Sequence, residues 1–235
     1  MMAAERGASA NTIAAYRRDL EGLEAALSAK FEDCTQKQLE KAIGKLGAEL
    51  SPRSLARKIS SFRQFFGFLQ EEGARADNPA ARIPLPKQPK SLPKFLSAQE
   101  VKQLLETVAA EDSRASVRLY ALIALLFATG LRVSELVTLK LAAVDRMVKS
   151  GEPLLQVRGK GNKERLVPVN PQALAALKAY LDLREGKSPW LFPSRSKEGH
   201  LTRQNFALLL KEAALKAGLD PDKVSPHVLR HSFAT

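Results

Sequence analysis

Several cationic side chains occupy positions that a bound anion would explain. Arg132 directly follows the 13-residue uncharged run Leu119–Leu131, so we expect a partly buried guanidinium that needs an anion. Lys160 lies between two glycines, which let a backbone approach a ligand closely. His227 and Arg230 are three residues apart, so they share one face near the start of the last predicted helix, where free N–H groups favour an anion. Together these four side chains suit a phosphate whose charge rises in a transition state.

Each position also has a plainer interpretation. Arg132 could pair with Glu135, which is three residues further along a helix. Lys160 could be a solvated turn lysine. His227 and His231 have the spacing of zinc ligands, but no glutamate lies between them and no third ligand is evident. We therefore predict a capping or hydrogen-bonded histidine pair and no metal site.

Other standard chemistries lack their motifs. The sequence has no Walker loop, dinucleotide fingerprint or serine nucleophile elbow, so we predict no cofactor. The single cysteine, Cys34, excludes an internal disulfide framework. The longest uncharged run is shorter than the ~20 residues that span a bilayer, and the first residues lack the apolar segment of a secretory signal. We expect a cytoplasmic protein without membrane insertion.

The charge balance indicates a polyanionic partner. Lysine and arginine number 37 against 25 acidic residues, which gives a formal net charge of +12. Residues 1–90 carry +4 and residues 91–235 carry +8, so a single basic tail does not account for the excess. Nucleic acid is the commonest partner of such a chain, although a generically basic protein shows the same balance.

A proline-rich segment divides the chain. Residues 84–94 (PLPKQPKSLPK) hold four prolines and three lysines. Proline blocks helices and central strands, so this segment is predicted to be an extended linker. Before it, apolar residues repeat at helical spacing, and no segment alternates like a strand. We predict a helical domain over residues 1–83, with helices at 9–27, 35–50 and 51–72, and a second domain over residues 95–235.

The helix that begins at Ser51-Pro52 is predicted to have one apolar face and one basic face. No acid lies within it up to Gln70, which favours contact with DNA over the alternative of a solvated outer face. The candidate DNA-binding residues are Arg53, Arg57, Lys58, Arg63 and Gln64 here, and Arg203 and Gln204 at the start of a later helix.

The second domain is predicted to be mostly helical around one hairpin. The segment Arg118–Ala128 is apolar on nearly every side and is the predicted central helix. Strands at Leu154–Arg158 and Arg165–Val169 flank the turn GKGNKE. The other predicted helices cover residues 98–110, 132–140, 171–184, 202–218 and 226–235.

Five segments carry a family resemblance. TGLRVSEL (129–136), GKGNKERLVP (159–168) and SPHVLRHSFAT (225–235) resemble the tyrosine recombinases, specifically the bacterial Xer subgroup. SANTIAAYRRDL (9–20) resembles the start of their core-binding domain, and LPKFLSAQEV (92–101) the start of their catalytic domain. The last of the three main motifs is more similar to the XerD type than to the XerC type.

The resemblance implies a fold and a chemistry. The fold would be mainly α: a helical core-binding domain and a mostly helical catalytic domain with a small β-sheet, forming a C-shaped clamp around duplex DNA. Arg132 and Arg230 would hold the non-bridging oxygens of the scissile phosphate. Lys160, with Lys163 as its rival, would protonate the 5′-hydroxyl leaving group, and His227 would assist proton transfer from a tyrosine nucleophile.

The same resemblance implies a biological role. The full-length protein would be a site-specific DNA recombinase that resolves chromosome dimers at cell division, with a second Xer-type recombinase in a heterotetramer on its DNA site. Phage or integron-type integrases and non-catalytic DNA-binding proteins are the alternatives.

One feature departs from the family pattern. Members continue beyond HSFAT to a second histidine and then to the tyrosine that forms a 3′-phosphotyrosyl link. The tyrosines here are Tyr16, Tyr120 and Tyr180, all upstream of the His-x-x-Arg motif. We expect the chain to be a fragment that binds DNA but does not cleave it.

Overall fold

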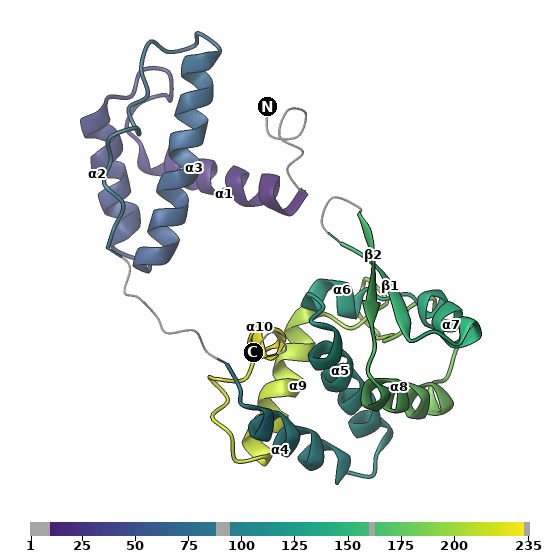
Figure 1. The fold of residues 1–235 in the computed structure, drawn as a ribbon. Helices are drawn as coiled ribbons and strands as arrows, with labels where there is room; N and C mark the ends of the chain where they lie inside the picture. Colours follow the sequence, from purple (N-terminus) through teal and green to yellow (C-terminus); the bar gives the residue numbers. More distant parts are fainter. Residues whose placement is uncertain (1–9, 88–94, 160–162, 233–235) are drawn as a thin grey trace. The chain divides into compact units, whose positions relative to one another are not determined.

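The computed structural model describes residues 10–87, 95–159 and 163–232. The chain divides into two compact units, residues 1–91 and residues 92–235, and each is described separately (Figure 1). Across these described residues, none of the helices combines the length and the apolar character that crossing a membrane requires. Residues 84–87 of the predicted linker are irregular, and the rest of that segment lies outside the described residues.

The first unit is helical, as predicted. It contains α1 (Ala10–Ala26), α2 (Gln36–Gly47) and α3 (Pro52–Glu71). Thr35 and Ser51 cap α2 and α3 by accepting hydrogen bonds from backbone N–H groups three residues later. The core of this unit consists mainly of large apolar side chains: Leu23, Leu39, Ile43, Ile59, Phe62 and Phe66. The apolar face predicted for α3 is therefore the buried face.

The second unit is mainly helical with one two-stranded sheet, which confirms the predicted fold class. Its elements in chain order are α4 (Ala98–Ala109), α5 (Arg114–Thr129), α6 (Val133–Val137), α7 (Leu141–Ser150), β1 (Leu154–Arg158), β2 (Glu164–Pro168), α8 (Pro171–Leu183), α9 (Arg203–Lys216) and α10 (Pro226–Ser232).

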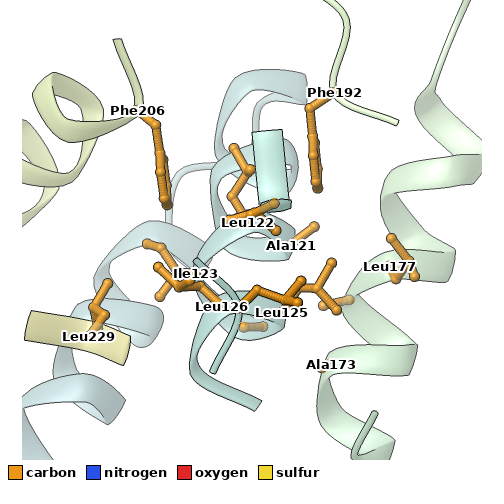
Figure 2. Packing of buried hydrophobic residues seen from close by; sticks show 14 of the residues in the cluster. Ala121, Leu122, Ile123, Leu125, Leu126, Ala173, Leu177, Phe192, Phe206 and Leu229 are labelled. Atoms are coloured by element: carbon orange, nitrogen blue, oxygen red, sulfur yellow. The ribbon is translucent and has the colours of Figure 1, made fainter. Parts of the chain in front are cut away.

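Helix α5 forms the centre of the second unit, as its sequence predicts. All six residues from Ala121 to Leu126 are buried, because α4, α8 and α10 all pack against this helix. Figure 2 shows Leu229 of α10 on one side of α5 and Leu177 of α8 on the other. Gly130 follows the last residue of α5 as its C-cap, and its positive φ of 57° is the left-handed conformation that glycine adopts without strain.

The hairpin places an arginine on its inward face. In the antiparallel register, Leu155 pairs with Val167 and Val157 pairs with Arg165. Paired residues share a face of the sheet, and Leu155, Val157 and Val167 are buried. Arg165 therefore lies on the side of the hairpin that faces the core, where an apolar residue would be expected.

The segment after Arg132 differs from the prediction. A single helix was expected over residues 132–140, but α6 ends at Val137 and a separate helix, α7, begins at Leu141. A segment from far along the chain explains the break. The Leu141 N–H donates to the carbonyl of Pro189 at 2.9 Å, and the Leu191 N–H donates to the carbonyl of Leu139 at 2.8 Å. These tertiary hydrogen bonds use the Leu141 N–H and the Leu139 carbonyl, which a continuous helix would need for its own hydrogen bonds.

Candidate active site

Helix α10 is held by its apolar residues and presents its polar ones. Leu229 and Val228 are buried, and the Ser225 hydroxyl caps the helix by accepting from the Val228 N–H at 3.2 Å. The Leu96 N–H donates to the Ser232 hydroxyl at 2.8 Å, which ties the start of the second unit to this helix. Elsewhere on α10, His227 is exposed and Arg230 is half-buried.

Arg230 carries a buried donor without an acceptor. Its Nη1 atom is inaccessible to solvent and has no hydrogen-bond partner in the described part of the chain. A buried donor that is left unpaired costs about 1–3 kcal/mol, and more when the group is charged. Anion binding by this guanidinium stays a prediction, because Nη1 would first have to become accessible to the anion.

His227 and His231 form a pair. Their Nε2 atoms are 3.0 Å apart and their rings meet edge to face at 80°. One ring donates this hydrogen bond and the other accepts it. Within the described ranges, no three histidine, cysteine, aspartate or glutamate side chains are grouped closely enough to hold a metal ion.

Arg132 pairs with Glu135, the interpretation that the sequence left as its alternative. The Arg132 backbone N–H donates to Glu135 Oε2 at 2.8 Å, and Arg132 Nη1 donates to Oε1 at 2.9 Å. The side chain of Arg132 is 51% exposed, so the expectation of a partly buried guanidinium is met only in part. Glu135 accepts from a single guanidinium nitrogen of Arg132, so the other guanidinium N–H groups of Arg132 can donate to a second acceptor.

Sequence reasoning missed Arg165, which also binds Glu135. Its Nη1 and Nη2 atoms donate to Oε1 and Oε2 at 3.0 and 2.8 Å. Burial raises the pKa of Glu135, but the hydrogen bonds from Arg165 and Arg132 outweigh burial and lower it to about 2. One signal was present in the sequence: Arg165 is spaced two residues from the apolar Val167, so strand alternation places it on the inward face.

Arg132 and Arg230 lie on two elements that each contact α5. Arg132 is the N-cap residue of α6 and lies three residues after the end of α5, and α10, which carries Arg230, packs against α5. Lys160 lies outside the described residues, so its position relative to them stays a prediction. Its rival Lys163 is exposed, and the Lys163 carbonyl accepts from the Gly159 N–H at 2.7 Å.

The candidate DNA-binding residues of α3 are less free than the sequence suggested. That helix itself contains no acid near them, but Asp19 of α1 reaches across to it. Arg57 Nη1 and Nη2 donate to the two Asp19 carboxylate oxygens at 2.5 and 2.7 Å, and Lys58 Nζ lies 3.1 Å from Oδ1. The acid that pairs with Arg57 and Lys58 thus comes from another helix, and DNA contact by these two residues stays a prediction.

The other candidates differ in their contacts. Arg63 donates to the carbonyls of Ala80 and Ile83, which joins α3 to the chain before the linker. Gln64 accepts from the Tyr16 hydroxyl at 3.2 Å. Three candidates, Arg53, Arg203 and Gln204, are exposed on the first turns of α3 and α9.

Comparison with known families identifies the chain. Residues 94–235 match the phage integrase family, and residues 1–73 match the phage integrase N-terminal SAM-like domain. The chain belongs to the phage integrase family of tyrosine recombinases. Among the described residues of the three main motifs, 133–136 lie on α6, 164–168 form β2 and 226–232 form α10.

Curated relatives cover the whole chain. The recombinase is 50% identical over 238 residues to tyrosine recombinase XerC of Erythrobacter litoralis and spans 75% of that protein. It is 46% identical over 246 residues to tyrosine recombinase XerD of Caulobacter vibrioides and spans 79% of it. The Xer resemblance is confirmed, and the relatives carry both subgroup names.

Solved structures share the fold. The crystal structure of the XerA recombinase matches 99% of this chain and 79% of its own, with 29% identity and a TM-score of 0.52. The XerH recombinase bound to palindromic difH substrate matches 97% of this chain and 69% of its own, with 22% identity and a TM-score of 0.75.

Proposed function

We propose that this protein is a site-specific DNA recombinase that cuts and rejoins duplex DNA through a 3′-phosphotyrosyl intermediate. Resolution of chromosome dimers at cell division, in the cytoplasm, is the role that its Xer relatives suggest. The observation that carries the proposal is the placement of Arg230 on α10, which packs against α5, and of Arg132 three residues after the end of α5. Both side chains lie in recombinase motifs.

The chemistry assigned to these residues is electrostatic. In the cleavage step a tyrosine oxygen attacks the phosphorus, and the bond from phosphorus to the 5′-oxygen breaks. Negative charge then rises on the non-bridging oxygens, and the forks of Arg132 and Arg230 stabilise it with charge-assisted hydrogen bonds. Arginine suits this role because it keeps its charge at any physiological pH.

Two further residues would move protons. His227 assists removal of the nucleophile's proton, and Lys160 supplies a proton to the departing 5′-oxygen. The covalent link to the enzyme retains the energy of the phosphoester, so rejoining is the reverse of cleavage and requires no external energy source.

The proposed partners are a duplex recombination site and a second Xer-type recombinase that completes a heterotetramer. A lambda integrase dimer bound to a core site shares this fold, with 21% identity and a TM-score of 0.75, and the XerH structure contains difH substrate. Relatives named XerD, such as that of Caulobacter vibrioides at 46% identity, favour an XerD-like member of such a pair.

A nicked suicide substrate tests the proposal. The cleaved end diffuses away from such DNA, so the full-length recombinase should accumulate as a protein–DNA band that resists denaturant. Arg230→Ala in the same protein should abolish the band, while Arg158→Ala, an exposed arginine paired with Glu164, serves as the matched control. Specific DNA binding without any covalent band would favour the alternative of a non-catalytic DNA-binding protein.

A further inference from the structure

We propose that Arg165 is a positioning residue for DNA cleavage: it orients the Glu135 carboxylate, which in turn holds the guanidinium of Arg132 ready for the scissile phosphate. This inference rests on the proposed function, since it assigns Arg165 a part in the same reaction. Arg165 itself need not touch the DNA.

The first support is the symmetry of the hydrogen bonds around Glu135. Each carboxylate oxygen accepts from both arginines. Oε1 accepts from the Nη1 atoms of Arg132 and Arg165, and Oε2 accepts from the Arg132 backbone N–H and from Arg165 Nη2. Arg165 uses both terminal nitrogens of its fork, and two parallel bonds of this kind fix the plane of a carboxylate. Arg132 then meets a carboxylate that is already oriented.

The second support is the burial of the group. The Glu135 side chain is only 5% exposed, while those of Arg132 and Arg165 are 51% and 38% exposed. A buried carboxylate must keep its partners, since water cannot replace them. If Arg165 were removed, Arg132 would be the remaining charged partner. Its fork would turn to pair with both oxygens, and the N–H groups intended for the phosphate would be used on Glu135.

The third support is the space reserved for Arg165. Gly159 follows β1 immediately, and a Cβ atom added there would lie 2.8 Å from Arg165 Nη1 and 3.5 Å from Glu135 Oε1. Even a methyl group at this position would crowd Nη1 and force the flexible end of Arg165 to shift from its present position on the carboxylate. Glycine at 159 therefore has a packing reason that is independent of turn conformation.

The proposal yields a rescue experiment in the full-length recombinase. Single-turnover cleavage is measured on suicide DNA that carries either the natural scissile phosphate or a methylphosphonate, which has no charge on its non-bridging atoms. The variants are Arg165→Ala, Arg165→Lys and Gly159→Ala. Reference variants are Arg132→Ala, for direct loss of the phosphate clamp, and Arg158→Ala, for an arginine on the exposed side of the same hairpin.

We expect Arg165→Ala and Gly159→Ala to slow cleavage of the natural phosphate by about 10- to 100-fold, the scale of a small misplacement of a reacting group. Affinity for uncleaved DNA should change by less than about threefold, because Arg132 retains its charge. On the methylphosphonate substrate, Arg165→Ala and Gly159→Ala should cleave at rates within about threefold of the parent protein, because a neutral phosphorus centre needs less cationic stabilisation. The same is expected of Arg132→Ala. Arg165→Lys should restore only part of the rate, since an ammonium cannot make two parallel bonds.

The outcomes separate this inference from the proposed function. If the parent protein cleaves the natural substrate and both Arg165→Ala and Gly159→Ala match its rate, Arg165 has no positioning role. Equal slowing on both substrates would also overturn the inference, because the defect would not act through the phosphate clamp. Failure of the parent protein to cleave either substrate would instead reject the proposed function. Should Arg165→Ala fold poorly, Gly159→Ala retains every charged partner and decides the matter.

Discussion

Each of the two units contains a buried carboxylate with two basic partners, and the two sites use them differently. In the first unit, Arg57 gives both terminal nitrogens to Asp19 and Lys58 binds the same carboxylate, so the cluster joins α1 to α3. In the second unit, Arg165 gives its fork to Glu135, while Arg132 gives one side-chain nitrogen and its backbone N–H. In the second unit, Arg165 therefore occupies the Glu135 carboxylate and leaves Arg132 available for a ligand.

The largest expected effect is a difference in cleavage rate between substitutions of Arg132 and Arg57. Arg132→Ala in the full-length recombinase should slow covalent cleavage by about 10²–10³-fold, the loss typical of one donor to a developing oxyanion. Arg57→Ala should change the cleavage rate of DNA-saturated protein by less than about threefold, because its fork is committed to Asp19. Suicide-substrate kinetics at saturating protein measures both. Equal losses would remove the distinction between a structural and a functional cluster.

Acid should weaken the second unit through Glu135. Its pKa is about 2 in the folded chain against the ordinary value of 4.5, so its stabilising contribution is complete above pH 4.5 and declines as the pH falls toward about 2. This group should account for about 2 kcal/mol of the stability lost between pH 7 and pH 3. Urea unfolding of the parent and of Glu135→Gln at the two pH values measures it. The glutamine variant should lack this part of the pH dependence.

A smaller effect on stability is expected in the first unit. Arg57→Ala leaves Asp19, whose side chain is 3% exposed, with Lys58 as its remaining basic partner. Loss of two hydrogen bonds to a buried carboxylate should cost about 1–3 kcal/mol. Hydrogen exchange of the α1 and α3 amides reports it. Arg53→Ala, an exposed residue on the same helix, is the control and should stay within about 0.5 kcal/mol.

The smallest effect concerns DNA affinity. If the chain neutralises about six phosphates, log K should fall with log salt at a slope near −5. Arg53→Ala should reduce the magnitude of that slope by about one, because the charge of Arg53 lies on an exposed first turn. Arg57→Ala should reduce it by less, since Asp19 already balances that charge. Salt titrations by fluorescence anisotropy measure the slope for each variant. A larger reduction of the slope for Arg57→Ala than for Arg53→Ala would mean that DNA displaces Asp19 from Arg57.

Local signals predicted most of the secondary structure. Five side chains each precede a helix and cap it with a hydrogen bond from a backbone N–H group: Thr35, Ser51, Ser97, Asn170 and Thr202. The strand that follows the hairpin turn begins at Glu164, one residue before its predicted start. Helix α5 begins at Arg114, four residues before the predicted segment, because Ser113 caps it and that cap was overlooked. Such signals act over a few residues and can be read from sequence.

Contacts between distant segments were beyond this reasoning. Helix α7 was not predicted, because the break before it depends on hydrogen bonds to Pro189 and Leu191, about fifty residues further along. Asp19 and Arg57 are 38 residues apart, and Glu135 and Arg165 are 30 apart. Sequence periodicity does not predict which basic side chain will pair with a buried carboxylate.

The sequence by itself determined the helices and their caps, the buried centre at α5, and the family, because the motifs that carry the resemblance are short and ordered. It also predicts a phosphate-handling role for Arg132, His227 and Arg230 from residue type and spacing. The tertiary structure alone decided how the charges are shared. It paired Arg57 and Lys58 with Asp19, brought Arg165 to Glu135, and left Arg230 Nη1 without an acceptor among the described residues. The physical reason is that a buried charge is stabilised by whatever lies within about 4 Å of it, and folding sets those neighbours without regard to sequence distance.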